Sequence, residues 1–402
     1  MSEDWKETTL NDIVVSSRIR KMPNELGIDQ VVHYSIPAFD ETGGALLESV
    51  DSIASHKFLV PEDSVLVSLL NPRIPRILKA TGGSNAVCST EFAALRPKGS
   101  TIGLDFLHVL CTSADFSNRL QAVAKGTTGS RKRAHLNDLL GFKIALPPLA
   151  TQRRIVAVID SIDNQIAALN VEQNAAVAMV RSLRTSLGVG EEYTTLSELA
   201  CDNGIQIGPF GSQLHAHEYV DDGIPVVMPQ DIVNGKVTKT KIKRVSSETA
   251  LRLKKHRLST GDIVFPRRGD LSKRALITDD QDGWLCGTGC LRFRARDIDS
   301  AQRVFEALSN DTATEWLIGH AVGTTMLNLN TSILHALPVP VFKDEMSALA
   351  DACRDLATFT SQVDHEASSL RTTRSATLNA LLSREIEIPE SFDELLNTKV
   401  AV

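Results

Sequence analysis

The sequence has 402 residues, a hydrophobic fraction of 42% and a formal net charge of −6. A chain of this length predicts two or three domains, each able to bury a core. Aromatic residues make up only 5%, which argues against broad stacking platforms for single-stranded nucleic acid. The sequence contains neither a signal-peptide pattern nor an apolar run long enough to cross a bilayer, so we expect a cytoplasmic protein.

The six cysteines are scattered, and only Cys286 and Cys290 stand close together. No matching Cys or His pair lies near them in the sequence, so reduced thiols fit better than a disulfide framework or a zinc site. His215 and His217 could ligate a metal, although such a pair in a polar loop is usually solvated. We expect no metal and no cofactor on this chain.

The charge is distributed unevenly along the sequence. Residues 343–402 contain six basic and eleven acidic residues, and so account for five of the six net negative charges. Residues 236–274 contain 13 basic and three acidic residues. A partner that carries phosphates would therefore be contacted through this basic stretch, whatever the net charge of the whole chain.

Residues 1–149 form a first predicted globule of mixed α/β character. The apolar residues 64–70 predict a buried strand that ends at Asn71 and its following proline, and residues 88–95 predict the next strand.

Two groups of cations in this globule are candidates for phosphate contact. Arg73, Arg76 and Lys79 lie among prolines that exclude a regular helix, so they belong to an extended or turning segment. The run Arg131, Lys132 and Arg133 follows a glycine-containing loop, where backbone N–H groups can approach a phosphate. A solvated charge run explains that loop equally well.

The first globule leads into a long helix. Apolar residues recur at steps of four and three, which is the pattern of a helix that supercoils against a partner. Thr151 is the expected N-cap, Gly188 and Gly190 the stop, and the length is on the order of 50 Å. The repeating positions are Ile155, Ile159, Ile162, Ile166, Leu169, Gln173, Ala176, Val180, Leu183 and Leu187.

Residues 189–342 then repeat the cycle as a second globule, in which residues 193–199 resemble residues 5–13. Residues 208–214 form a glycine-rich turn that lacks the lysine and the flanking elements of a nucleotide-binding loop. Residues 223–230 predict a short strand. The next predicted strand, within 261–269, places Arg267 and Arg268 at a turn. Arginine there can contact a guanine edge, or it can contact only a phosphate or form a surface salt bridge, and the sequence leaves these readings open.

A second long helix follows, and a shared spacing over ten positions indicates a tandem repeat. The acidic tail from Glu385 onwards is expected to fray. Adding 194 to each position of the first helix gives Leu349, Cys353, Leu356, Thr360, Val363, Ala367, Leu370, Arg374, Thr377 and Leu381.

The order of these elements and their boundary motifs resembles the specificity (S) subunit of type I restriction-modification systems. The motifs that carry the resemblance are Leu146-Pro-Pro-Leu-Ala-Thr-Gln-Arg-Arg-Ile-Val-Ala157, Gly208-Pro-Phe-Gly-Ser212, Gly223-Ile-Pro-Val226, Gly261-Asp-Ile-Val264 and Gly323-Thr-Thr325, with Leu70-Asn-Pro-Arg-Ile-Pro-Arg76 and Ser89-Thr-Glu-Phe92.

This resemblance implies two target-recognition domains that each read one half of a split double-stranded DNA site. It implies two long antiparallel helices that set the gap between the halves and dock two modification subunits, which bind S-adenosylmethionine and methylate adenine. A restriction subunit, an ATP-dependent translocase and nuclease, is a further partner in such systems. The specificity subunit itself is not catalytic.

Two features refine that expectation. No stretch resembles an S-adenosylmethionine glycine loop or an adenine pocket, since Asn71-Pro72-Arg73 lacks the second proline and the aromatic residue. The first globule has Ser16-Ser-Arg-Ile-Arg20 roughly where the second has Gly208-Pro-Phe-Gly-Ser212. Two globules that differ in this way predict an asymmetric target.

The expected fold is therefore α+β, a tandem pseudo-repeat of two mixed α/β domains separated by two antiparallel coiled-coil helices. The expected boundaries are 1–149, 150–188, 189–342, 343–385 and an acidic tail at 386–402. A coiled-coil scaffold without sequence-specific DNA binding is the alternative. The candidate DNA-binding residues are Arg73, Arg76, Lys79, Arg131, Lys132, Arg133, Lys241, Lys243, Arg244, Arg267, Arg268, Lys273 and Arg274, and the candidate helix-packing residues are Ile155, Ile159, Ile162, Ile166, Leu169, Val180, Leu183, Leu349, Leu356, Val363, Leu370 and Leu381.

Overall fold

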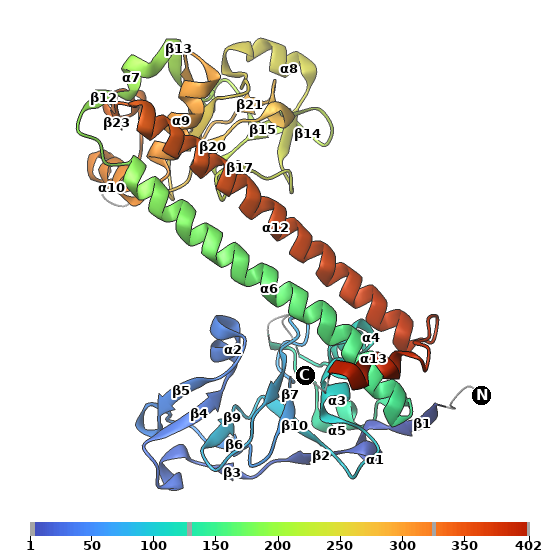
Figure 1. The fold of residues 1–402 in the computed structure, drawn as a ribbon. Coiled ribbons are helices and arrows are strands. Elements are labelled where there is room, and N and C mark those ends of the chain that lie inside the picture. The colour runs from blue at the N-terminus through green and yellow to red at the C-terminus, as the bar shows by residue number, and fades with distance from the viewer. Residues whose placement is uncertain (1–4, 127–130, 324–326, 400–402) are drawn as a thin grey trace. The chain divides into compact units, whose positions relative to one another are not determined.

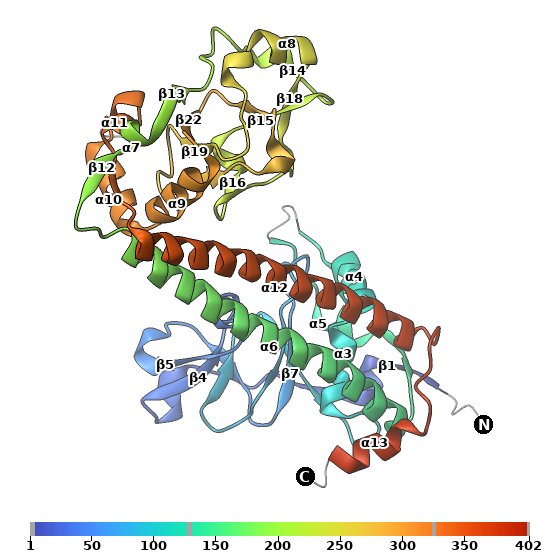
Figure 2. The same cartoon turned by 45° about the horizontal axis from the view of Figure 1, so that its top comes forward.

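The computed structural model describes residues 5–126, 131–323 and 327–399, and the chain divides into two compact units. Unit 1 comprises residues 1–169 with 366–402, and unit 2 comprises residues 170–365. The helices α6 (Leu149–Leu187) and α12 (Asp344–Leu382) each begin in one unit and end in the other. Each unit therefore combines one globule with one part of both long helices (Figures 1 and 2).

Unit 1 contains sheets of two, four and five strands, in the orders β1-β11, β2-β10-β7-β8 and β3-β6-β9-β4-β5. Neighbouring strands run antiparallel except β4 and β9, which run parallel. The strands are β1 (Lys6–Thr9), β2 (Val14–Ser17), β3 (Arg20–Lys21), β4 (Gln30–Tyr34), β5 (Leu46–Ser49), β6 (Lys57–Leu59), β7 (Ser64–Ser68), β8 (Ile77–Ala80), β9 (Ala86–Cys88), β10 (Phe92–Pro97) and β11 (Lys143–Leu146). The shorter helices are α1 (Leu10–Ile13), α2 (Ile36–Thr42), α3 (Leu104–Cys111), α4 (Ala114–Val123), α5 (Leu136–Leu140) and α13 (Phe392–Lys399).

Unit 2 repeats this plan, with sheets in the orders β12-β23, β13-β22-β19-β20, β14-β18-β15-β21 and β16-β17. Here the parallel pair is β15 with β21. The strands are β12 (Tyr193–Thr195), β13 (Ala200–Ile207), β14 (Tyr219–Val220), β15 (Ile224–Val227), β16 (Ile232–Val233), β17 (Lys236–Val237), β18 (Lys243–Val245), β19 (Ile263–Pro266), β20 (Ala275–Leu276), β21 (Leu285–Cys286), β22 (Cys290–Ala295) and β23 (Pro338–Pro340). The shorter helices are α7 (Leu196–Leu199), α8 (Ser247–Arg252), α9 (Ile298–Leu308), α10 (Asp311–His320) and α11 (Thr331–Ala336).

The tandem repeat is visible in the way both globules open and close. Strand β1 leads into the helical turn α1 and pairs with β11, and β12 leads into α7 and pairs with β23. In both units the closing strand directly precedes a long helix. The expected fold class, α+β with two mixed domains and two long helices, is confirmed.

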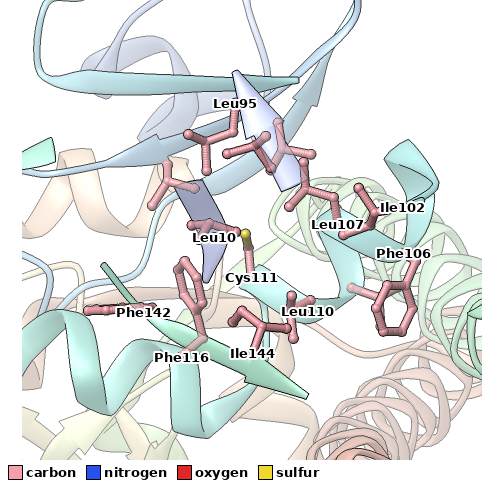
Figure 3. Packing of buried hydrophobic residues seen from close by; sticks show 14 of the residues in the cluster. Leu10, Leu95, Ile102, Phe106, Leu107, Leu110, Cys111, Phe116, Phe142 and Ile144 are labelled. Atoms are coloured by element: carbon pink, nitrogen blue, oxygen red, sulfur yellow. The ribbon is translucent and has the colours of Figure 1, made fainter. Parts of the chain in front are cut away.

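The main core of unit 1 lies between the four-stranded sheet and helices α3, α4 and α6. Figure 3 shows Leu10, Leu95, Cys111 and Phe116 converging within it. The rings of Phe116 and Phe142 meet edge to face, with centroids 5.6 Å apart, a favoured geometry for aromatic pairs.

The two long helices pack antiparallel within each unit. In unit 1, Ile155 and Ile159 near the start of α6 share a core with Leu378 and Leu381 near the end of α12. In unit 2, Leu187 at the end of α6 clusters near the start of α12, together with the residues Val180, Ala350 and Cys353. All twenty repeating positions of the two helices are buried or half-buried. No helix among the described residues combines the length and apolarity of a membrane span.

Two of the polar residues at the repeating positions, Gln173 and Arg374, make specific contacts across the helix pair. Gln173 donates from Nε2 to Asp364 Oδ1 at 3.2 Å in unit 2. Arg374 donates to both carboxylate oxygens of Asp163 in unit 1, with Nη2 to Oδ2 at 2.9 Å. These two paired polar groups favour one register of the helix pair.

Three local predictions need correction. Residues 88–95 form the end of β9 and the start of β10, because a turn at Ser89 divides them. Helix α6 begins at Leu149, so Thr151 lies inside its first turn and is not the N-cap. The acidic tail is not without structure, because residues 392–399 form α13 and Asp393 accepts two hydrogen bonds of 2.9 Å from Arg154.

Candidate nucleic-acid interface

In unit 1, the connection between β7 and β8 lies against the segment that precedes α5. Leu70 and Arg133 form an isolated antiparallel bridge, and Asn71 N donates to Lys132 O at 2.7 Å. Ala134 N donates to Leu69 O at 2.9 Å. Two cation runs that are some 55 positions apart in the sequence therefore meet at one edge of the unit.

The cations of these runs have different environments. Arg73, Arg131 and Lys132 are exposed and form no ion pair with any residue in the described ranges. Lys79 pairs with Asp105 at 2.9 Å, and Arg133 pairs with Glu91. The exposed three are thus the freest to meet a phosphate.

Arg76 is held inside the protein. It is 8% exposed, and its Nε and Nη2 donate to the two carboxylate oxygens of Asp40 at 2.6 and 2.8 Å. The hydrogen bonds from Arg76 lower the pKa of Asp40. This bidentate pair ties α2 to the β7–β8 connection, so Arg76 positions the loop on which Arg73 is carried.

Unit 2 has the same arrangement after β19. Arg268 and Asn328 form an antiparallel bridge, and Leu329 N donates to Arg267 O at 2.9 Å. The side chain of Arg268 donates from Nε to Asn328 Oδ1. The exposed Arg268 therefore occupies the position of Leu70, and Asn328 that of Arg133. The glycine-threonine motif at 323–325 falls largely outside the described residues.

The Gly208-Pro-Phe-Gly-Ser212 motif lies beside this arginine pair. The Arg267 guanidinium stacks over the Phe210 ring, 5.9 Å from its centroid, and Phe210 is 50% exposed. A Cβ at Gly208 would come within 1.9 Å of Gly287 O, so the turn can approach the end of β21 only with glycine there. Phe210 is a candidate contact that charge counting alone misses, although an aromatic residue in a glycine-rich turn is a readable signal.

The remaining cations of the basic stretch serve mixed roles. Lys241 is exposed, Lys243 lies 4.7 Å from the Tyr219 ring centroid, and Arg244 donates to Gly223 O at 3.0 Å. Lys273 is half-buried and Arg274 is only 4% exposed. Charge density along the sequence therefore overstates the number of side chains that can reach DNA.

The described residues form neither a cluster of metal-ligating side chains nor a disulfide bond. They contain no group of three or more His, Cys, Asp or Glu side chains arranged for a metal. The rings of His215 and His217 stack 5.5 Å apart. All six cysteines are free thiols, and burial raises the pKa of Cys88 to about 12.

Comparison with known proteins agrees with this architecture. Residues 2–178 match the family described as the type I restriction modification DNA specificity domain. A curated relative, the type I restriction enzyme MjaVIII specificity subunit of Methanocaldococcus jannaschii, is 20% identical over 96% of this chain and 94% of its own length. The chain is therefore similar to the specificity subunits of type I restriction-modification systems.

Further similar proteins cover the chain to different extents. The HindI specificity subunit of Haemophilus influenzae is 24% identical over 44% of this chain, a match that spans 39% of that relative. A solved type I restriction-modification structure, concerned with complex assembly and conformational transition, gives a TM-score of 0.57 at 18% identity over 94% of this chain and 97% of the other. The specificity subunit from M. genitalium gives 0.56 at 14% identity over 94% and 96%. The resemblance inferred from the motifs is thus confirmed, and these structures share the fold.

Proposed function

We propose that this chain reads a split double-stranded DNA site, with one globule contacting each half. One observation supports this most directly. The same arrangement occurs in both units. The connection that follows β7 in unit 1, or β19 in unit 2, is bridged to a later segment of the same unit. Each copy presents exposed cations, such as Arg73 and Arg268.

The two halves of the target differ in this proposal. Unit 2 presents the guanidinium of Arg268, which can meet guanine O6 and N7 in a major groove. Unit 1 has Leu70 at that position and presents Arg133 from the bridged segment instead. Different donors at equivalent places favour an asymmetric site.

The long helices supply the second part of the proposal, which is assembly with two modification subunits. Several apolar side chains on the unit 2 part of the helices face away from the seam, including Val171 at 70%, Val177 at 50% and Met179 at 55% exposure. Exposed apolar side chains on a helix favour contact with another protein. We infer that the modification subunits bind S-adenosylmethionine and methylate adenine, that restriction subunits can join, and that this cytoplasmic chain contributes recognition without catalysis.

The decisive experiment is sequencing of methylated adenines in cells that carry the modification subunit, with and without this chain. We expect a split, asymmetric motif only when the chain is present. A palindromic motif would contradict the asymmetry, and identical methylomes with an active modification subunit would contradict the specificity role.

A coiled-coil scaffold is the competing function, and salt dependence separates the two. Each neutralised phosphate lowers the logarithm of the DNA affinity by about 0.9 per decade of salt. We expect a steep slope for the assembled complex, whereas a scaffold would give none.

A further inference from the structure

A polar pocket of about 540 Å³ opens in unit 2, between the end of α6, the β16–β17 hairpin and the start of α10. Its lining includes the cations Arg181, Lys273 and Arg274, and the carboxylates Asp270 and Asp311. The pocket is therefore rich in charged side chains. Those that are not already paired within the protein determine which ligand the pocket can bind.

Arg274 is the most deeply buried of these cations, at 4% exposure. Its Nη2 donates to Thr314 Oγ1 at 2.7 Å and to Ser272 O at 3.1 Å. Its Nε and Nη1 have no acceptor among the described residues. Burial, and then the positive charge of Arg184, lower the pKa of Arg274 to about 10, so the guanidinium remains charged at neutral pH.

The carboxylates nearby are already engaged. Asp311 pairs with Arg181 at 2.8 Å, and Glu306 pairs with Arg184 at 2.7 Å. Asp270 accepts hydrogen bonds from the backbone and side chain of Ser272, which lower its pKa. Within the described ranges, Arg274 forms no ion pair, although a buried cation is stable only when it is compensated.

The repeat shows that the fold does not require this cation. In unit 1, Leu66 pairs with Leu78, and in unit 2 the corresponding Val264 pairs with Ala275. Ile77, which precedes Leu78, and Arg274, which precedes Ala275, therefore occupy equivalent positions in the two units. Ile77 packs against the main core of unit 1, so an apolar side chain satisfies the same place.

We propose that this pocket binds one phosphate group, with Arg274 as the principal ligand and Lys273 contributing charge. The unpartnered N–H groups at Nε and Nη1 of the Arg274 guanidinium match an oxyanion that has several acceptor oxygens. Free phosphate and the DNA backbone share this chemistry. The DNA source rests on the proposed function, because the segment lining the pocket continues directly from Arg268.

The first test measures binding of inorganic phosphate to the full chain by isothermal titration calorimetry, with chloride at matched ionic strength as the reference. We expect saturable binding in the native chain and at least a tenfold loss in Arg274→Ile, which introduces the residue of unit 1. Arg292→Met is the matched control, because Arg292 is equally buried but donates to three backbone carbonyls outside the pocket. Undiminished binding in Arg274→Ile, or none in the native chain, overturns the proposal.

Arg274→Lys is a second variant, to be used if Arg274→Ile does not fold. It retains the charge but loses the fork of N–H donors, so we expect phosphate affinity to fall by about tenfold. Binding equal to that of the native chain would show that Arg274 is not the ligand.

The second arm identifies the source of the phosphate. If the pocket holds a DNA phosphate, Arg274→Lys preserves the salt slope of DNA binding by the assembled complex, and Arg274→Ile reduces it by about 0.9. If it holds free phosphate, both slopes match the native one while the calorimetric loss persists. Failure of DNA binding altogether would contradict the proposed function and leave the calorimetric result standing.

Discussion

The two units solve the same packing problem with opposite chemistry. The place where the long helices meet the globule is apolar in unit 1 and holds a buried polar cluster in unit 2. The helix repeat relates Ile159 to Cys353 and Leu378 to Arg184, and the sheet registers relate Ile77 to Arg274. Val109 and Glu306 form the fourth pair, because each lies four residues before an N-cap, Ser113 in unit 1 and Asn310 in unit 2. The four unit 1 residues are Ile77, Val109, Ile159 and Leu378, and the unit 2 residues at those places are Arg274, Glu306, Cys353 and Arg184.

The difference between the units lies in how much each residue depends on its neighbours. The apolar cluster gains free energy from burial, which tolerates many shapes. In unit 2, Glu306 accepts hydrogen bonds from Arg184 Nε at 2.7 Å and from Cys353 Sγ at 3.2 Å. Burial, and then Glu306, raise the pKa of Cys353 to about 12, so the thiol stays protonated. Removing one member of this cluster leaves the remaining polar groups without their hydrogen-bond or ion-pair partner.

The largest effect is expected for Ile159→Asp in unit 1. Ile159 is fully buried within the apolar core cluster of unit 1. The free energy of unfolding of unit 1 should fall by on the order of 5 kcal/mol, measured by urea titration. Val171→Asp, at a position 70% exposed on the unit 2 part of the same helix, should change the free energy of unfolding of unit 2 by less than about 0.5 kcal/mol. Equal effects of the two changes would refute the burial of the seam.

Next in size is Glu306→Gln in unit 2. This change leaves the half-buried Arg184 and the buried Cys353 without the carboxylate that both contact, so we expect unit 2 to lose about 3 kcal/mol. Asp311→Asn breaks the exposed Arg181 pair, whose side chains are 76% and 74% exposed, and should cost under about 1 kcal/mol. If the two changes cost the same, the cluster in unit 2 is not acting as a buried one.

The pH dependence of unit 1 should follow from His108, whose place in unit 2 is taken by Phe305. Burial, and then the charges of Lys79 and Arg374, lower the pKa of His108 to about 4. A depressed folded pKa means that its contribution is complete above the unfolded value near 6.5 and is lost as the pH falls toward 4. We expect unit 1 to lose roughly 2 to 3 kcal/mol over this window.

His108→Phe separates this effect from the other acid-sensitive groups of unit 1. Urea titrations at pH 7 and pH 4.5 should show a smaller loss of stability in His108→Phe than in the native chain. An unchanged loss would assign the acid sensitivity to other groups of unit 1, such as the carboxylates or His33, whose pKa is also lowered by burial.

The DNA interfaces should differ in a similar way. Arg268→Ala should relax one base position in the half-site of unit 2 by about 1–3 kcal/mol, as measured by binding to a library of sites. Arg73→Ala in unit 1 is the companion change and should weaken all sequences alike, with a salt slope lower by about 0.9. A uniform loss in Arg268→Ala would make it a phosphate contact as well.

The smallest change is expected when the polar pair is removed as a whole. Arg184→Leu combined with Glu306→Val gives unit 2 the residues of unit 1, and replacing a buried pair together is often neutral or stabilising. We expect unit 2 to be within about 1 kcal/mol of the native stability, in contrast to Glu306→Gln. If the double variant were as unstable as Glu306→Gln, the loss of stability would come from altered packing and not from the broken ion pair.

The sequence alone predicted the features that depend on local periodicity. The seam of α6 and α12, the repeat of residues 5–13 at 193–199, and the placing of Arg267 and Arg268 just beyond a strand could all be inferred from spacing. Each follows from a side-chain period of about 3.5 or 2, or from turn residues, which the chain carries wherever it folds.

The tertiary structure alone decided which cations are available. Arg73 and Arg76 stand three positions apart on one connection, yet Asp40 buries the second and leaves the first exposed. Arg274 is buried by α10, and Asp393 in the tail is tied down by Arg154. The partner of a charged side chain comes from a distant part of the chain, so its cost of desolvation is set by long-range packing and leaves no local pattern in the sequence.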